Sequence, residues 1–370
     1  MNSRERVLRT LKHEVPDRVP LALGGSAYNI NDIAYKNLIR YLGLSDDWKP
    51  FRNDGFKTSN YLDERVLSVL NIDFRYIYMP TPDLVKKDGG IFRNGWGQTI
   101  EKSGEFLHTS ATLADATIKD IENYAWPNAD DYKISPDVIE KAKQYKEAGY
   151  AVVARSVCSY GFMEQSEHLR GSEQFLVDMM IDESIAKCIV DHVGNTILNL
   201  TKVYLENVKD FIDIYELPGD DYGSQAGPLI SVDLFNKYFK PWYKKIVELV
   251  KGMSPNVYVL AHSDGFITPF IPEFIDAGID IIHPLQPNTG MDNTAIKKEY
   301  GKYVTFLGAV DIQSALPSGV EATKKEVKTR IKELGDGGGY IVAPANHIGP
   351  DVKPEAIVAM YKTAMEYGKY

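Results

Sequence analysis

The sequence is poor in cysteine, because its 370 residues include only Cys158 and Cys188. Two cysteines cannot build a disulfide framework, and such low usage is typical of a reducing compartment. Long hydrophobic runs are also missing, since no stretch reaches the roughly 18 uncharged apolar residues of a membrane span. The opening residues MNSRERVLRTLKHE contain no apolar secretory core. These absences predict a cytoplasmic protein that neither crosses a membrane nor is secreted.

Basic residues are also fewer than acidic ones. Lys and Arg number 42 against 51 Asp and Glu, which gives a net charge of −9. Nucleic acids and anionic membranes would repel such a surface, so neither is an expected partner. With 44% hydrophobic and 25% charged residues, the composition excludes collagenous, coiled-coil and disordered chains. The length suits one α/β barrel spanning residues 1–370.

A repeated pattern supports that barrel. Short runs rich in β-branched and apolar residues alternate with amphipathic segments, and such runs are typical of parallel strands buried on both faces. About eight of them occur, the number that a closed (β/α)8 TIM barrel needs. The predicted strands are Arg18–Leu23, Phe74–Met79, Ala151–Val157, Phe211–Glu216, Val257–Ala261, Ile279–His283, Val304–Leu307 and Tyr340–Ala343.

Two additions to the barrel are predicted. The charged, amphipathic first residues indicate an N-terminal helical extension. After the second predicted strand, turn signals at Gly89-Gly90, Asn94-Gly95 and Ser103-Gly104 predict a β-meander insertion. Helix signals are clearest at Ser231, a predicted N-cap before a segment kinked at Pro241, and over Val320–Leu334, which Gly335 ends.

Ionisable side chains gather where the predicted strands end, which is where barrel enzymes place reactive groups. Neutral imidazole and carboxylate oxygen suit zinc or a similar divalent ion, so a metal site is one interpretation. The residues concerned are His262, His283, His347, Glu216, Asp220, Asp221, Asp264 and Asp311.

Each of these residues also has a structural interpretation. His262 could bond a neighbouring loop, and Glu216 or Asp220 could cap a helix or form an ion pair. His283, which precedes Pro284, is predicted to be structural. Cys158 is a candidate soft ligand, although a lone buried cysteine usually behaves as a small hydrophobe.

Several motifs in this order resemble the uroporphyrinogen decarboxylase superfamily over nearly the whole chain. The resemblance rests on RERVLRTLKHEVPDRVP at the start, GDDYGSQAGPLIS from residue 219, AHSDGFITPFIPEFIDAGIDIIHPLQP from residue 261, FLGAVDIQSALPSG from residue 306 and GGGYIVAPANHIGPDVKPEAIVAMY from residue 337. It implies a TIM barrel, in agreement with the count of strands.

Within that superfamily the chain looks more like the corrinoid-dependent methyltransferases. The decarboxylases have an arginine-rich loop after the first strand, whereas GGSAYNINDIAY here contains no Arg or Lys to bind a polycarboxylate. In the thiol-using methyltransferases, zinc is held by a His-x-Cys and a later Cys. The matching positions here are His262 and Asp264, then Asn346 or His347. A harder N/O ligand set would suit activation of an ether or alcohol oxygen.

The resemblance therefore implies an O-demethylase methyltransferase that moves a methyl group from a methoxylated, aromatic donor to the cobalt(I) of a separate corrinoid protein. Lewis-acid or general-acid activation of the ether oxygen is expected, with zinc as the metal. A homodimer is one assembly that such a protein could form. The expected roles are metal binding by Glu216, His262, Asp264 and His347, catalysis by Asp220, Asp221 and His262, and substrate binding by Tyr28, Asn29, Tyr160, Phe162, Tyr222 and Asn346.

Three alternatives stay open at this point. The chain could be a decarboxylase of the uroporphyrinogen type. It could transfer a methyl group from a corrinoid protein to a thiol or folate. It could also be a non-catalytic scaffold that binds a corrinoid protein, although so many ionisable residues at one mouth favour a catalytic use.

Overall fold

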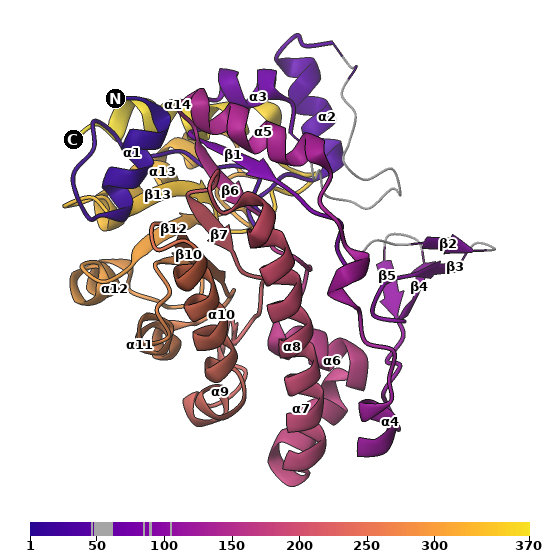
Figure 1. Cartoon of the computed structure of the whole chain (residues 1–370). Coiled ribbons are helices and arrows are strands. Elements are labelled where there is room, and N and C mark those ends of the chain that lie inside the picture. The colour runs from indigo at the N-terminus through magenta and orange to yellow at the C-terminus, as the bar shows by residue number, and fades with distance from the viewer. Residues whose placement is uncertain (46, 48–61, 84–85, 89–90, 104–105) are drawn as a thin grey trace.

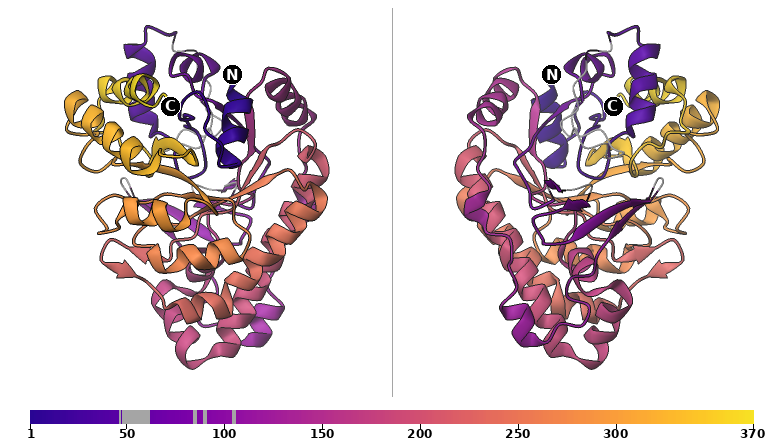
Figure 2. Two further views of the ribbon diagram at one scale, coloured as in Figure 1. Left: turned by 90° about the vertical axis from the view of Figure 1, so that its left-hand side faces the viewer. Right: turned by 90° about the vertical axis from the view of Figure 1, so that its right-hand side faces the viewer.

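A computed structural model describes residues 1–45, 47, 62–83, 86–88, 91–103 and 106–370. Seven strands form one curled parallel sheet in the order β1-β6-β7-β10-β11-β12-β13. Helices surround the sheet, as both sides of Figure 2 show. The TIM-barrel-like α/β fold predicted from the sequence is thereby confirmed. The strands are β1 Phe74–Ile77, β6 Ala151–Ala154, β7 Ile214–Glu216, β10 Tyr258–His262, β11 Ile281–His283, β12 Thr305–Val310 and β13 Tyr340–Pro344.

The prediction of a regular first strand over Arg18–Leu23 is wrong. This segment makes isolated main-chain contacts instead, and Pro20 cannot donate to a ladder. It nevertheless lies between the two edge strands: Ala22 N–H donates to the Val342 carbonyl, and Asp73 N–H donates to the Leu21 carbonyl, both at 2.9 Å. An irregular segment therefore takes the eighth position of the barrel.

The helices follow the strands in chain order, and the N- and C-terminal helices lie close together (Figure 1). The predicted N-terminal extension is confirmed as α1, where Arg6 forms an ion pair with the buried Asp73 at 2.7 Å. The helices are α1 Ser3–Leu11, α2 Asp32–Tyr41, α3 Glu64–Val69, α4 Ile118–Glu122, α5 Pro136–Glu147, α6 Phe162–Arg170, α7 Ser172–Ile181, α8 Glu183–Val208, α9 Val232–Tyr238, α10 Lys240–Met253, α11 Ile271–Asp276, α12 Asn293–Tyr300, α13 Val320–Leu334 and α14 Pro354–Tyr367, with 3-10 turns at η1 Ala129–Asp131 and η2 Thr268–Phe270.

Helix boundaries agree with the capping signals. The Ser231 side chain accepts from the Leu234 N–H at the start of α9, and the predicted kink is a break between α9 and α10 at Phe239, two residues before Pro241. The predicted helix Val320–Leu334 matches α13, with Gly335 as its C-cap. No helix in the described part of the chain is both long and apolar enough to cross a bilayer.

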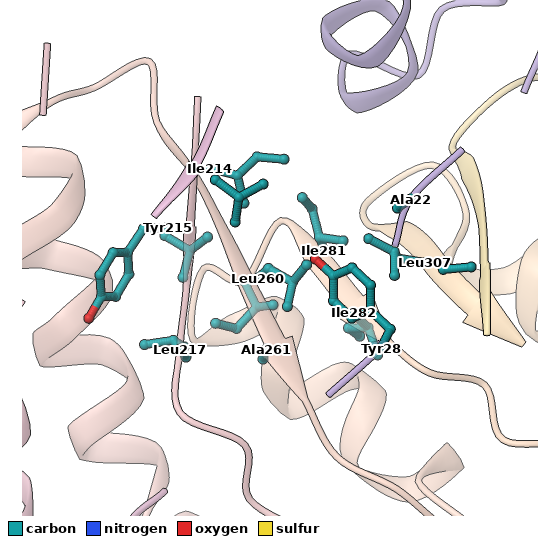
Figure 3. Packing of buried hydrophobic residues seen from close by; sticks show 14 of the residues in the cluster. Ala22, Tyr28, Ile214, Tyr215, Leu217, Leu260, Ala261, Ile281, Ile282 and Leu307 are labelled. Atoms are coloured by element: carbon teal, nitrogen blue, oxygen red, sulfur yellow. The ribbon is translucent and has the colours of Figure 1, made fainter. Parts of the chain in front are cut away.

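The core lies where neighbouring strands pack their apolar side chains. Ile214, Leu260 and Ile281 come from three adjacent strands and gather at the centre of the sheet in Figure 3, with Leu307 beside them. All four are at most 1% exposed. Burying a side chain of this size stabilises a fold by about 1.5–3 kcal/mol, so the sheet is a rigid platform for the groups at its rim.

The predicted meander is confirmed as an antiparallel sheet that projects beside the barrel (Figure 1). Its strands are β2 Lys86–Asp88, β3 Ile91–Arg93, β4 Thr99–Ser103 and β5 Phe106–Thr109, and the Asn94-Gly95 signal falls between β3 and β4. The signals at Gly89-Gly90 and Gly104 lie outside the described residues. The Gln98 amide donates to the His168 carbonyl at 2.9 Å, which ties the insertion to α6.

Candidate functional site

A cavity of about 370 Å³ opens at the carboxyl ends of the strands. Loops after β1, β6, β7, β10 and β13 contribute to it, together with the loop that follows the irregular eighth segment. This volume is in the roughly 300–1,000 Å³ range of small-molecule sites. Its lining residues are Ser26, Ala27, Tyr78, Met79, Thr81, Asp83, Arg155, Ser156, Cys158, Ser159, Tyr160, Glu164, Leu217, Gly219, Asp221, His262, Asp264, Asn346 and His347.

Three of these residues form a cluster that could hold a metal ion. His262 Nε2 lies 3.5 Å from Asp221 Oδ1 and 3.8 Å from Asp264 Oδ2. One ligand atom of each residue falls within 4.8 Å of the others. The Asp264 N–H donates to Asp221 Oδ1 at 2.7 Å, which orients that carboxylate. One imidazole nitrogen and two carboxylate oxygens are a donor set that suits zinc, so the residues present fit the implied metal.

Burial shifts the pKa values of Asp264, which belongs to the cluster, and of His347, which lies beside it in the cavity lining. Burial raises the pKa of Asp264 to about 6, against the opposing effect of His262. The Asn346 amide donates to Asp264 Oδ2. Burial, helped by Arg155 and His262, lowers the pKa of His347 to about 3, so that imidazole is neutral. Its buried Nδ1 has no hydrogen-bond partner among the described residues.

Glu216, a predicted metal ligand, lies apart from this cluster. Its carboxylate accepts from the Ser26 N–H at 2.8 Å and from Ser26 Oγ at 2.9 Å. The Nε of Arg155 donates to the same Ser26 Oγ at 3.2 Å. Burial raises the pKa of Glu216, while the Arg155 charge opposes that shift. Glu216 thus belongs to a buried network behind the cavity wall.

Asp220 does not line the cavity either. Its carboxylate accepts from the main-chain N–H of Met163 at 2.9 Å and of Glu164 at 2.8 Å, and from the Tyr222 hydroxyl at 2.5 Å. Burial raises the pKa of Asp220 to about 6. The residue therefore holds the N-terminus of α6, the helix that brings Glu164 to the cavity.

The expected substrate-binding residues divide in the same way. Tyr160 and Asn346 line the cavity. Tyr222 and Phe162 instead pack among aromatic rings, with Tyr222 4.7 Å from Phe235 between ring centroids. Tyr28 and Asn29 are fully buried, and Tyr28 is among the core residues labelled in Figure 3.

Arg155 and Glu164 are cavity residues that were not singled out from the sequence. Arg155 is the only Arg or Lys among the described residues that line the cavity, and its guanidinium lies 4.7 Å from the centre of the Tyr78 ring. The sequence does carry a signal that could have found it, namely a charged residue within the otherwise apolar run AVVARSV. Burial, with the nearby Asp221 and Asp220, raises the pKa of Glu164 to about 9. No sequence pattern distinguishes Glu164 from other acids in first helical turns.

His283 is fully buried at the end of β11, where burial holds its pKa well below the ordinary value. Its Nδ1 lies 2.8 Å from His262 Nδ1. The prediction that His283 is structural named no partner for it; in the structure its partner is His262 of the Asp221–His262–Asp264 cluster.

Comparisons with solved structures agree with the barrel. A methyltransferase from Methanosarcina mazei matches with a TM-score of 0.66 and 16% identity over 99% of each chain. A putative vitamin-B12 independent methionine synthase from Listeria monocytogenes matches with a TM-score of 0.45 and 11% identity, over 94% of this chain and 98% of that one. At 16% identity, the match to the Methanosarcina mazei protein shows a shared fold alone.

Comparisons of the sequence are more specific. Among curated proteins there is no match. A family model described as uroporphyrinogen decarboxylase (URO-D) matches residues 117–367. The matched segment includes every cavity-lining residue from Arg155 onward and the whole Asp221–His262–Asp264 cluster. This chain therefore belongs to the uroporphyrinogen decarboxylase family.

Proposed function

We propose that this protein is a methyltransferase that moves a methyl group from a small methoxylated, aromatic donor to the cobalt(I) of a separate corrinoid protein. The observation that most supports this proposal is the Asp221–His262–Asp264 cluster inside a small cavity. The similarity in fold to the Methanosarcina mazei methyltransferase is consistent with it.

The charge of the cavity argues against the decarboxylase alternative. Asp83, Asp221 and Asp264 line it, and Arg155 is the one Arg or Lys among the described lining residues. A porphyrinogen with many carboxylates would need several cationic partners in a site that excludes water. A neutral or singly charged ether needs none, so the lining favours a small donor.

Asp221, His262 and Asp264 are the residues that would hold zinc. When bound, the ion would supply Lewis-acid polarisation of the ether oxygen. Ether cleavage needs such help, because an aryloxide is a poor leaving group at neutral pH, and stabilising its developing charge is worth several kcal/mol.

Other side chains of the cavity would supply a proton and orient the donor. Glu164 holds a proton at neutral pH and could deliver it to the leaving oxygen as a general acid. Tyr160 and Asn346 would orient the donor, while the partner's corrinoid accepts the methyl group at the open mouth. Asp220, Phe162 and Tyr222 would act indirectly, by fixing α6 and the β7 loop.

The test mixes the protein with a reduced corrinoid protein and a panel of methoxyarenes, and follows methylation of cobalt by absorbance. We expect transfer from at least one ether and a large loss of transfer in His262→Ala. His192→Ala is the matched control, because His192 stacks on Trp126 at the outer helix α8.

Other outcomes would point to the alternatives. Loss of carboxylates from a porphyrinogen, with no transfer from any ether, would make the protein a decarboxylase. Transfer only from the methylated corrinoid to a thiol or folate would reverse the proposed direction. If His262→Ala transferred methyl groups as fast as the parent, the Asp221–His262–Asp264 cluster would not take part in the reaction.

A further inference from the structure

We propose that His283 is a positioning residue, which fixes the proton of His262 on Nδ1 and so directs the lone pair of His262 Nε2 toward Asp221 and Asp264. This proposal concerns the cation site itself and is independent of the reaction that the site serves.

The two histidines face each other because of strand register. His262 ends β10 and His283 ends β11, and the two residues are paired partners in the parallel ladder. Their Nδ1 atoms are 2.8 Å apart, and the ring planes are tilted by 28°. This distance is that of a hydrogen bond, so one Nδ1 must donate and the other must accept.

The opposite side of the His283 ring decides which nitrogen donates. His283 Nε2 lies 3.1 Å from the carbonyl oxygen of Pro344. A carbonyl oxygen only accepts, so Nε2 must hold a proton. A neutral His283 then has a bare Nδ1, and that Nδ1 accepts from the Nδ1–H of His262.

The surroundings favour the neutral form of His283. Its side chain is fully buried, and each ring nitrogen already has one partner. Tyr28 packs on the ring with centroids 4.8 Å apart. In the described part of the chain no carboxylate bonds to this ring, and a buried imidazolium without a counter-charge is costly.

The consequence appears on the other side of His262. With its proton on Nδ1, His262 presents a lone pair from Nε2 to Asp221 Oδ1 and Asp264 Oδ2, at 3.5 and 3.8 Å. Three electron-pair donors then converge with no hydrogen between them. Such a set is repulsive when empty and favourable around a divalent cation. The other tautomer would place an N–H there and close the site to a metal.

Gly308 leaves room for this arrangement. A Cβ at Gly308 would lie 2.8 Å from His283 Cδ2 and 3.0 Å from His283 Nε2, and the residue has a φ of +101°. A side chain at position 308 would therefore strain the backbone and press on the His283 ring.

The direct test is the tautomer of each ring in the metal-free protein. Long-range ¹H–¹⁵N NMR on protein labelled at its seven histidines distinguishes protonated from bare ring nitrogens, and His262→Gln and His283→Gln assign the signals. We expect His262 protonated on Nδ1 and His283 on Nε2. A bare Nδ1 on His262 would overturn the proposal.

The second test compares two substitutions that keep different halves of the ring. Asn places its amide oxygen near the former Nδ1, so His283→Asn can still accept from His262. Gln reaches toward the former Nε2, so His283→Gln retains the Pro344 contact and loses the acceptor. We expect zinc affinity, measured by competition with a chromophoric chelator, to fall about 10–100-fold in His283→Gln and much less in His283→Asn.

Thermal melts of both variants control for folding. If the two folded variants bind zinc with equal affinity, whether weakened or unchanged from the parent, the positioning role is contradicted. If the parent bound no zinc at all, the NMR measurement would still decide the tautomer. If ether demethylation failed while the affinities separated as expected, only the proposed function would be lost.

Discussion

The carboxylate of Asp220 accepts a hydrogen bond from the backbone N–H of Glu164 at 2.8 Å, although 56 residues separate the two. Through this bond the loop after β7 holds the first turn of α6. Gly161 permits the approach, because a Cβ there would lie 2.6 Å from the Asp220 side chain. The position of Glu164 in the cavity therefore depends on Asp220.

Asp220→Ala is expected to destabilise the fold, because it leaves the buried N–H of Met163 and the Tyr222 hydroxyl without their acceptor. Losing bonds to a buried carboxylate should cost about 2–4 kcal/mol. Urea unfolding followed by circular dichroism measures the loss. Asp220→Asn keeps one acceptor oxygen and should cost less; an equal cost would contradict this role.

Glu164→Gln is expected to stabilise the protein above pH 4.5. The pKa of Glu164 rises from 4.5 to about 9 on folding, so the folded state keeps a proton that the unfolded state releases between these values. Stability of the parent therefore falls as pH rises through that window, and the neutral amide avoids this loss. The parent loses about 1.4 kcal/mol for each pH unit inside that window, so the advantage of Glu164→Gln should grow steadily from pH 4.5 to pH 8.

That advantage should vanish at pH 4, where both states of the parent hold the proton. Urea midpoints at the two pH values measure it. Glu206→Gln, at an exposed position of α8, is the control and should show no such pH-dependent gain. A Glu164→Gln advantage that does not change with pH would refute this assignment.

Arg155→Met is expected to destabilise the protein by about 3–5 kcal/mol, because it leaves the buried Glu216 without its counter-charge. Glu216→Gln in the same chain should restore much of that stability. Chemical denaturation of the two single variants and the double variant gives the coupling energy. Additive losses in the double variant would show that the two side chains do not depend on each other.

Zinc is expected to stabilise the parent, because binding to the folded state alone shifts the unfolding equilibrium. At a free concentration 100 times Kd the gain is about 2.7 kcal/mol, which raises Tm. Asp221→Asn removes one of the three donors and should reduce the rise. Differential scanning calorimetry with zinc or EDTA measures it, and an equal rise in His262→Ala would place the ion elsewhere.

The fold was largely predictable from local pattern. Apolar runs gave the strands of the main sheet, and the capping residue Ser231 marked the start of α9. The prediction of a regular first strand over Arg18–Leu23 was wrong. The apolar run was real, but this segment makes only isolated bridges to its neighbours, and Pro20 has no N–H for a ladder. Strand ends also located the rim, since the fold itself places them together.

The roles of individual side chains were less predictable. Asp220 and Asp221 are neighbours in the chain, yet one bonds to α6 and the other faces His262. Tyr222 looked like a cavity residue but packs against Phe235. Neighbouring loop residues point in opposite directions, and composition does not record which one points inward.

By itself, the sequence determined a barrel of apolar strands with acids and histidines at one rim, because periodicity and element order are properties of the chain. Only the tertiary structure decided which of these groups meet. The His262–His283 hydrogen bond and the Ser26–Glu216 contacts join side chains from different loops or strands. Their directions follow from packing among distant segments, which no local pattern encodes.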